Sequence, residues 1–313
     1  MTSTFARRIL PIIAIGVVGA LVALNWSFNV FGLRAETGER QWHIKLKSRE
    51  QQAEPNCTVY NMSPGPQSIA ITASCIEFTT FVELVAEIAA DGKITRTRTV
   101  SAKDAQVGDI GSIKMISGFP VVLYVHPKDT NDKVPSVVSL DQAWNIQGVI
   151  REERTTGMTS DEALTFASAG FNVMPAGAYP QPSRALVKDT MMYAFTKPNT
   201  GKPNKAVAVD LKTGKPRWES QNDGNLYLQI LAVQDDKVFV LESGLNENKD
   251  HNQSIVTLDT TTGKVVDKVT TKIENPKGES VVAISYAFVY ADQRAYAVNT
   301  ANDDRTWLAY SVG

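Results

Sequence analysis

A repeated hairpin motif constrains the fold of this chain more than any other feature of the sequence. The segment AVDLKTGKPRW (208–218) has an apolar strand that ends in Asp, a turn with Thr-Gly-Lys, and a second strand with Pro and Trp. Related segments are GLRAETGERQW (32–42), EIAADGKITR (87–96) and TLDTTTGKVVD (257–267). Because one isolated hairpin is only marginally stable in water, the repetition predicts several sheets that pack on one another.

The spacing of the copies indicates how large each repeat is. Aligned on the position of Asp210, the copies fall at Arg34, Ile88, Asp141, Asp210 and Asp259, with a truncated sixth near Ser311. The differences between these numbers are 54, 53, 69, 49 and 52 residues. A period near 50 residues with four short strands is typical of a β-propeller blade. The long step predicts one inserted segment.

The segments between the copies favour an all-β fold. Short β-branched and aromatic runs alternate with Gly, Asn, Asp and Pro turns, and no helical apolar period is sustained after the N-terminal apolar run. The one predicted helix is TSDEALTFASAG (159–170), inside the insertion. We therefore expect a β-propeller of four-stranded blades with five recognisable units. The chain ends where the last strand of its final unit should begin, so we expect RQWHIKLK (40–47) to complete that blade.

The residues of the motif predict a structural role. Asp210 can accept hydrogen bonds from its own turn, Gly214 can adopt the positive φ that the turn needs, and Pro216 is expected on an outer edge strand. Trp42 and Trp218 are then expected to dock each blade on the next; stacking on a cofactor is the alternative. The predicted docking motif comprises Thr37, Gly38, Trp42, Ala208, Asp210, Thr213, Gly214, Lys215, Trp218, Asp259, Thr262, Gly263 and Lys264.

The N-terminal segment predicts a membrane anchor. After Arg7 and Arg8, residues 9–24 carry no charge, and apolar side chains continue to Phe31. A helix over 9–31 could cross a bilayer. No small-residue cleavage site follows the run, so we expect an uncleaved transmembrane anchor; a cleaved signal peptide is the alternative. The two arginines place residues 1–8 in the cytoplasm and residues 32–313 outside the cell membrane.

The two cysteines predict a disulfide. CTVYNMS (57–63) and SIAITASC (68–75) flank the turn PGPQ, and a hairpin centred near position 66 sets Cys57 directly opposite Cys75. Outside the cytoplasm, such a pair is expected to be oxidised, and two free thiols are the alternative.

Composition and motifs exclude several functions. A formal net charge of -1 provides no basic surface for nucleic acid. The histidines His43, His126 and His251 lack the spacing of metal ligands, and the acidic loops 129–132 and 302–304 lack that of a calcium loop. The sequence has no phosphate-binding, dinucleotide or nucleophile-elbow motif. We therefore predict no catalytic residue, no metal site and no cofactor.

The complete copy AVDLKTGKPRW resembles the tryptophan-docking motif of the PQQ-like (quinoprotein-type) β-propellers, over about residues 32–313. Arg34 replaces the Asp of the motif in the first copy, and Asp267 replaces the Trp in the fifth. The resemblance implies a propeller, which family members usually build from seven or eight blades. It also covers two kinds of function, quinone-dependent dehydrogenases and non-catalytic outer-membrane-assembly propellers. The dehydrogenases use an adjacent Cys-Cys pair, calcium and a chain about twice as long, whereas Cys57 and Cys75 are not adjacent.

Two function classes remain open. The favoured one is a membrane-tethered, extracytoplasmic binding or scaffolding module that engages an unknown envelope protein or cell-wall component. Its candidate partner loop lies in the insertion 151–170 and begins with Arg151, Glu152, Glu153 and Arg154. The alternative is an extracytoplasmic enzyme that uses the central funnel of the propeller.

Overall fold

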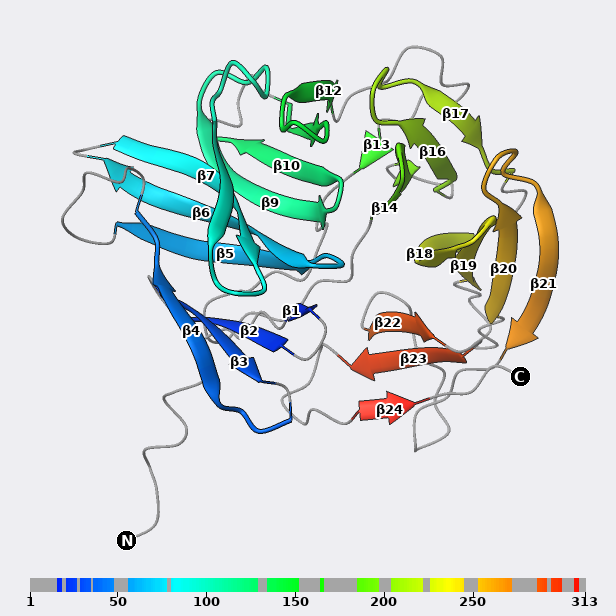
Figure 1. Cartoon of the computed structure of the whole chain (residues 1–313). Helices are drawn as coiled ribbons and strands as arrows, with labels where there is room; N and C mark the ends of the chain where they lie inside the picture. The colour runs from blue at the N-terminus through cyan, green and yellow to red at the C-terminus, as the bar shows by residue number, and fades with distance from the viewer. Residues whose placement is uncertain are drawn as a thin grey trace, which may run out of the picture. The chain divides into compact units, whose positions relative to one another are not determined.

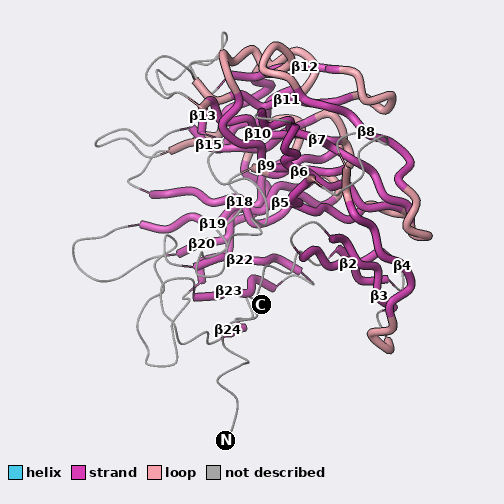
Figure 2. Tube along the Cα trace, turned by 90° about the vertical axis from the view of Figure 1, so that its left-hand side faces the viewer, coloured by secondary structure: helices cyan, strands magenta, loops and turns pink. Residues whose placement is uncertain are grey.

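The protein is described from a computed structural model (Figure 1). The structure describes residues 16–18, 21–26, 29–34, 36–47, 56–77, 80–128, 134–151, 164–165, 185–196, 204–221, 226–244, 253–271, 286–291, 294–299 and 307–309. All of the secondary structure in these ranges is strand and turn, and Figure 2 shows no helix in them. The chain divides into two compact units, Met1–Ile146 with Gly170–Pro180 and Gln147–Ala169 with Gln181–Gly313.

The first unit contains two complete antiparallel sheets and most of a third, each with its strands in chain order. The first sheet has β1 (Gly16–Val18), β2 (Leu21–Trp26), β3 (Asn29–Arg34) and β4 (Arg40–Lys45). The second has β5 (Cys57–Pro64), β6 (Ser68–Glu77), β7 (Thr80–Ala89) and β8 (Ile94–Val100). The third has β9 (Ile110–Gly118), β10 (Val121–Pro127), β11 (Ser136–Leu140) and β12 (Ile146–Arg151).

The second unit continues the same pattern. The fourth sheet has β13 (Leu164–Thr165), β14 (Leu186–Lys188), β15 (Met191–Thr196), β16 (Ala206–Asp210) and β17 (Pro216–Glu219). The fifth has β18 (Leu226–Gln234), β19 (Lys237–Gly244), β20 (Gln253–Asp259) and β21 (Val265–Thr271). The sixth has β22 (Tyr286–Ala291), β23 (Arg294–Asn299) and β24 (Trp307–Ala309). The all-β prediction is confirmed, and the four-stranded sheets have the strand order of propeller blades.

The described residues of the N-terminal apolar run form strands where the sequence predicted a membrane helix, and residues 9–15 of that prediction lie outside the described residues. Residues 16–34 contribute β1, β2 and β3 to the first sheet, and the side chain of Val30 is buried in the core. In the part of the chain that the structure describes, no helix has the length and apolar character needed to cross a membrane. A run of apolar residues satisfies its backbone hydrogen bonds equally well in a helix or in a buried sheet, so periodicity alone does not separate the two.

Two further expectations differ from the structure. Residues 40–45 pair with β3 through registers such as Phe31 with His43, so this strand is the fourth of the first sheet and not the completion of the last. The physical reason is local: the Thr37-Gly38 turn joins β3 to β4 directly, and a short hairpin connection favours pairing of neighbouring strands. In the segment 159–170, Leu164–Thr165 form the short strand β13, and the other residues of the predicted helix lie outside the described residues.

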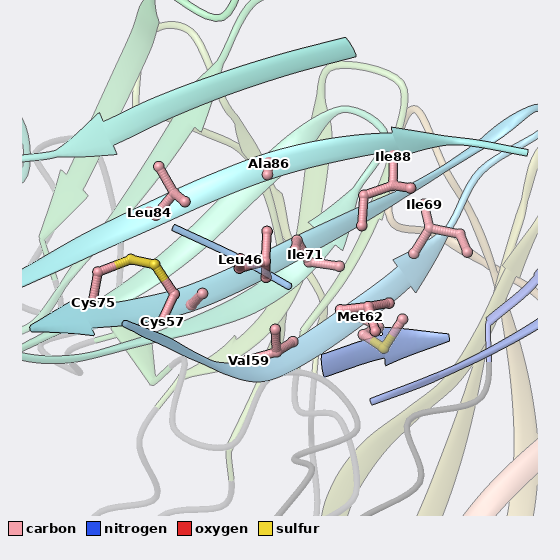
Figure 3. Packing of buried hydrophobic residues seen from close by; sticks show 12 residues of the cluster. Leu46, Cys57, Val59, Met62, Ile69, Ile71, Cys75, Leu84, Ala86 and Ile88 are labelled. Carbon is pink, nitrogen blue, oxygen red and sulfur yellow. A yellow bond between two sulfur atoms is a disulfide. The ribbon is translucent and has the colours of Figure 1, made fainter. Parts of the chain in front are cut away.

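The core lies between successive sheets. Figure 3 shows the cluster formed by side chains of the second sheet, such as Ile71 and Leu84, together with Leu46 of the segment after β4. A second cluster joins Val85 of β7 to Leu123 of β10, and a third joins Tyr193 and Trp218 of the fourth sheet to Val240 of the fifth. In inner strands such as β6, β7 and β10, side chains on both faces are buried, as expected for strands that pack between two neighbouring sheets.

Candidate functional site

The turn of the docking motif is closed by the Asp that begins it. In the fourth sheet, Asp210 Oδ1 accepts hydrogen bonds from the backbone N–H of Lys212 and Thr213 and from the Thr213 hydroxyl, at 3.0, 2.7 and 3.0 Å. Asp259 Oδ1 makes the same three bonds in the fifth sheet, to Thr261 and Thr262. The Asp of the motif therefore fixes a tight turn, which is the local reason why the sequence folds into a hairpin here.

The glycine of the motif has the backbone conformation that the turn requires. Gly38, Gly214 and Gly263 have φ of +69°, +68° and +68°, and each donates its N–H to the carbonyl of the residue four positions earlier. The second sheet uses a shorter turn, in which Gly92 donates to Ala89 and has φ +86°. Ala89, and not Ile88, therefore occupies the Asp position of the second copy.

The tryptophans of the motif lie between neighbouring sheets. Trp42 Nε1 donates to the carbonyl oxygen of Ala90 at 2.8 Å, and Trp218 Nε1 donates to that of Thr260 at the same distance. Each indole also lies against the turn glycine of the next sheet: a Cβ at Gly92 would come within 2.6 Å of Trp42, and one at Gly263 within 2.5 Å of Trp218. The structure thus places both rings at sheet-to-sheet contacts within their own units.

Wherever the structure describes this contact, the acceptor occupies the same position of the repeat, the residue that follows the Asp position. In the second sheet Arg96 occupies the Trp position, and its Nη1 donates to the carbonyl of Gln142, which follows Asp141. Within the second unit, Gly148 of β12 occupies the Trp position, and a Cβ there would lie 2.0 Å from the carbonyl oxygen of Leu211. Trp, Arg and Gly thus occupy the same position of the repeat, and each lies against the same backbone carbonyl of the next sheet. Sequence reasoning missed the last two because the acceptor is a backbone carbonyl, which leaves no side-chain signature.

The hairpin turn of the third sheet carries a tryptophan where the other copies of the motif carry glycine. Trp144 occupies the turn-glycine position of Asp141's hairpin with φ +66°, and its carbonyl accepts a hydrogen bond from Arg98 at 2.7 Å. Its side chain is buried in the cluster with Leu123. The turn therefore tolerates a large residue only where no tryptophan approaches it.

Hydrogen bonding holds the motif carboxylates in their charged form. The hydroxyl and backbone of Thr262 lower the pKa of Asp259, and the backbone N–H of Asn145 lowers that of Asp141. At Asp210, burial raises the pKa, but the bonds from Thr213 outweigh it, so the net pKa is lowered. The hydrogen bonds to each carboxylate come from its own turn, which indicates a structural role.

The predicted disulfide is present. Cys57 of β5 and Cys75 of β6 are directly opposite in the register, and their sulfur atoms are bonded across a sequence separation of 18 residues (Figure 3). Both side chains are fully buried in the cluster with Val59 and Leu84. A bond of this kind is typical of proteins outside the reducing cytoplasm.

A polar contact that the sequence did not predict connects the second and third sheets. The side-chain oxygen of Asn61 in β5 accepts hydrogen bonds from the Thr72 hydroxyl and from the backbone N–H of Met115 in β9, both at 3.1 Å. Asn61 is buried, so these bonds also offset the desolvation of its amide. The β-bulge between Val59 and Asn61 turns the residue toward this face, a local irregularity with no sequence signal.

The same face of the second sheet ends in an apolar pair and a buried acid. Ile76 and Phe81 are directly opposite near the β6–β7 turn, and 50% and 72% of their surfaces are exposed. One step inward, Glu83 lies opposite Ser74 and is only 7% exposed. Burial raises the pKa of Glu83, and a hydrogen bond with Ser74 offsets this in part. Both pairs belong to the β6–β7 register, for which the sequence analysis identified no turn, so neither pair was predicted.

The remaining sequence candidates lie in ordinary surroundings or outside the described residues. His43 Nε2 is hydrogen-bonded to Asn29 at 2.7 Å and its ring stacks on Phe31, whereas His126 has the ring of Tyr124 at its edge. Of the candidate partner loop, Arg151 ends β12, and Glu152, Glu153 and Arg154 lie outside the described residues, as do His251 and the loops 129–132 and 302–304. The residues that the structure describes contain no group of three metal-ligand side chains.

Comparison with known proteins identifies the repeat. Residues 172–309 match the model of a PQQ-like repeat family described as outer membrane protein assembly factor BamB. This segment contains the complete motif copy and the fifth sheet, so the PQQ-like resemblance of the sequence is confirmed for it. No curated protein matches the chain.

The chain also matches solved structures at low sequence identity and with TM-scores below 0.5. BamB from Moraxella catarrhalis is 13% identical with a TM-score of 0.38, covering 91% of this chain and 68% of its own. Quinohemoprotein alcohol dehydrogenase from Comamonas testosteroni is 12% identical with a TM-score of 0.48, covering 92% and 52%. The WD40 domain of SCAP from fission yeast is 10% identical with a TM-score of 0.40, covering 90% and 66%. The chain therefore spans about half the length of the dehydrogenase and about two thirds of the other two.

Proposed function

Because residues 172–309 carry the repeat of a family described as an outer membrane protein assembly factor, we propose that this chain is a protein-binding module of the cell envelope. The family match is the observation that carries this proposal. In this function the sheets form a scaffold, and residues outside the docking contacts bind the partner, which is another envelope protein. The Cys57–Cys75 bond supports an extracytoplasmic location, because structural disulfides persist in oxidising compartments.

The docking motif supports a scaffold in preference to a cofactor site. The indole N–H groups of Trp42 and Trp218 are bonded to carbonyls of the next sheet, and both rings pack on turn glycines. A tryptophan held in this way stabilises the contact between sheets and has little freedom to stack on a cofactor. The quinone-dependent alternative also needs an adjacent cysteine pair, whereas the two cysteines of this sequence are 18 positions apart and joined to each other.

The candidate partner surface remains the inserted segment that begins at Arg151. It follows the outer strand of the third sheet and accounts for the longest step between repeats. Long loops at the ends of strands tolerate variation at small cost to stability and commonly carry binding residues. We propose that Glu152, Glu153 and Arg154 contribute polar contacts to the partner.

In-cell photo-cross-linking with mass spectrometry tests this function. A photoreactive residue is placed at position 154 in the loop, and a matched one at Lys212, which is exposed on the turn of the docking motif. We expect a specific envelope protein to be captured from position 154 and not from 212. Deletion of residues 155–163 should leave the melting temperature nearly unchanged but abolish this capture. Equal capture from both positions, or capture that survives the deletion, would contradict the proposed loop. Absence of any envelope protein partner in a chain-wide cross-linking experiment would contradict the binding function itself.

A further inference from the structure

The outer end of the β6–β7 hairpin, at the left of Figure 1, exposes an apolar cross-strand pair. Ile76 and Phe81 are directly opposite one another and lie on the same face of the sheet as Ser74 and Glu83. With 72% of its surface exposed, Phe81 is the most exposed large apolar side chain among the described residues. An isolated exposed apolar residue is ordinary, but this pair lies beside an open sheet edge.

The edge is open because β8 is shorter than β7. The β7–β8 register begins with Glu83 opposite Val100, so no residue of β8 lies opposite Phe81 or Val82. After Val100 the chain leaves the sheet through a turn in which Ala105 donates its N–H to Ser101. The outer part of β7 therefore continues past the end of its neighbour.

The backbone groups of Phe81 point toward this open edge. Ile76 donates its N–H to Asn56 on the β5 side, so Ile76 and Phe81 form a pair without mutual hydrogen bonds across β6 and β7. Adjacent positions in an antiparallel pair alternate, and the N–H and C=O of Phe81 are accordingly directed away from β6. They offer one donor and one acceptor to an added strand.

A buried carboxyl group lies next to the open position. Glu83 is nine-tenths buried on the same face as Phe81, and its Oε2 has no hydrogen-bond partner among the described residues. The four side chains at this end of the face, Ser74, Ile76, Phe81 and Glu83, include one acid and no base. Arg98, on the same face, contacts Asp104 and the carbonyl of Trp144 through its terminal nitrogens, whereas its Nε has no hydrogen-bond partner among the described residues. A basic group from outside would supply the missing partner of Glu83.

The hairpin end is also held in place before any partner binds. The Cys57–Cys75 bond joins β5 to β6 one residue before Ile76, and the Asn56 side chain donates to the Ile76 carbonyl at 2.7 Å. A rigid edge loses little conformational freedom on binding, which favours strand addition.

We propose that the open edge of β7 at Phe81 binds an extended segment of a partner protein in which apolar and basic side chains alternate. This proposal rests on the function proposed above and adds a second contact surface and the chemistry of its ligand. The added strand follows β8 along the edge of β7 and exchanges hydrogen bonds with Phe81. A Lys or Arg opposite Phe81 covers the Phe81 ring with the apolar part of its side chain, and its charged end reaches diagonally to Glu83, a distance that long side chains span. The apolar residues at the intervening positions lie on the other face of the added strand.

The test uses the purified full-length chain with its disulfide intact and short synthetic peptides as probes. A blocked, fluorescein-labelled peptide that alternates Lys and Val is titrated at low salt and followed by fluorescence anisotropy. A peptide that alternates Glu and Val is the control ligand. Phe81→Pro removes the outward N–H but not a bond to β6, and Phe81→Ser removes the ring and keeps the N–H. Val266→Ser removes a comparably exposed side chain on β21 and is the control variant.

We expect the Lys-Val peptide to bind at least roughly tenfold more tightly than the Glu-Val peptide. Phe81→Pro, Phe81→Ser and Glu83→Gln should each weaken it roughly tenfold, with Val266→Ser unchanged. Slowed exchange of the Phe81 amide hydrogen in the complex would report the added strand directly. Equal affinity for the two peptides, or insensitivity to all three variants, would overturn the proposal. Binding to phospholipid vesicles is measured in parallel. If Phe81→Ser folds, keeps its affinity for the Lys-Val peptide and loses only its binding to vesicles, the proposal is overturned in favour of a membrane contact.

The binding function and the β7 edge site can be tested independently of one another. Photo-cross-linking from position 81 in cells should capture a partner at a segment of alternating apolar and basic residues. If position 154 captures an envelope protein and position 81 captures none, the binding function stands and the β7 edge is not part of it.

Discussion

The indole nitrogen of Trp218 donates a hydrogen bond to the carbonyl oxygen of Thr260, 2.8 Å away in the next sheet. The ring also approaches Tyr193, with 6.0 Å between centroids, and is 8% exposed. This contact joins the fourth and fifth sheets of the second unit, and the docking contact of Trp42 repeats it in the first. Its energetic importance comes from the size of the buried ring and from its hydrogen bond to the next sheet.

Trp218→Ala should destabilise the protein by roughly 3 to 5 kcal/mol, because it removes a large buried ring and leaves a cavity. Trp218→Phe keeps much of the packing but loses the bond to Thr260, and should cost about 1 to 3 kcal/mol. Denaturant unfolding of both variants measures the difference. A Trp218→Ala protein that unfolds like the parent would show that the ring is not a structural contact.

Gly263→Ala should be more damaging than Gly38→Ala. The two glycines have nearly the same positive φ, so the backbone strain of a new Cβ is matched. At Gly263 the Cβ would also lie 2.5 Å from the Trp218 ring, whereas at Gly38 no atom lies within 4 Å. The difference in melting temperature between the two variants therefore measures the cost of the contact between the new Cβ and the Trp218 ring. In a Trp218→Ala background the difference should disappear.

Glu83→Gln should stabilise the protein at neutral pH. Burial raises the pKa of Glu83, so the folded chain holds a proton that the unfolded chain has released between the ordinary pKa of Glu, about 4.3, and the raised value. Stability therefore falls as pH rises through this window, and the full penalty of the buried charge is present above it. The gain in melting temperature from Glu83→Gln should be largest at pH 7 to 8 and vanish near pH 4. A gain that is independent of pH would contradict this assignment.

Replacing both cysteines, as Cys57→Ala with Cys75→Ala, should cost roughly 3 kcal/mol, since the bond closes a loop of 18 residues. Reduction of the parent protein should lower its melting temperature to about that of the double variant. The melting temperature of the double variant itself should not respond to reductant. A double variant as stable as the parent would show that the bond is dispensable for folding.

The variant Val30→Asp distinguishes the strand β3 of the structure from the membrane helix that the sequence predicted. In the structure Val30 is fully buried in the cluster with Leu46 and Met62, so an unpaired carboxylate there should cost roughly 3 to 5 kcal/mol. Arg34→Gln, at the exposed end of β3, is the control and should be neutral. Calorimetry of the two proteins measures the effect. If Val30→Asp leaves the unfolding of the β domain unchanged, β3 is not part of the first sheet.

The sequence by itself determined the features that depend on short-range backbone chemistry. Asp210, Thr213 and Gly214 close their turn with atoms a few residues apart, so the hairpin and its repeats were predictable from the motif. The pairing of Cys57 with Cys75 followed from the position of one turn, because hairpin register is set locally.

Only the tertiary structure decided the features that depend on which surface lies opposite. The apolar run at the N-terminus could satisfy its backbone bonds in a helix or a sheet, and its contact with Leu46 and the second sheet selects the sheet. Arg96 and Gly148 replace tryptophan because the docking acceptor is a backbone carbonyl, which any suitably shaped residue can approach. The early end of β8, which leaves Phe81 and Val82 without a neighbour on that side, depends on the chain that leaves for the third sheet. Such contacts join residues far apart in the chain, and no local pattern encodes them.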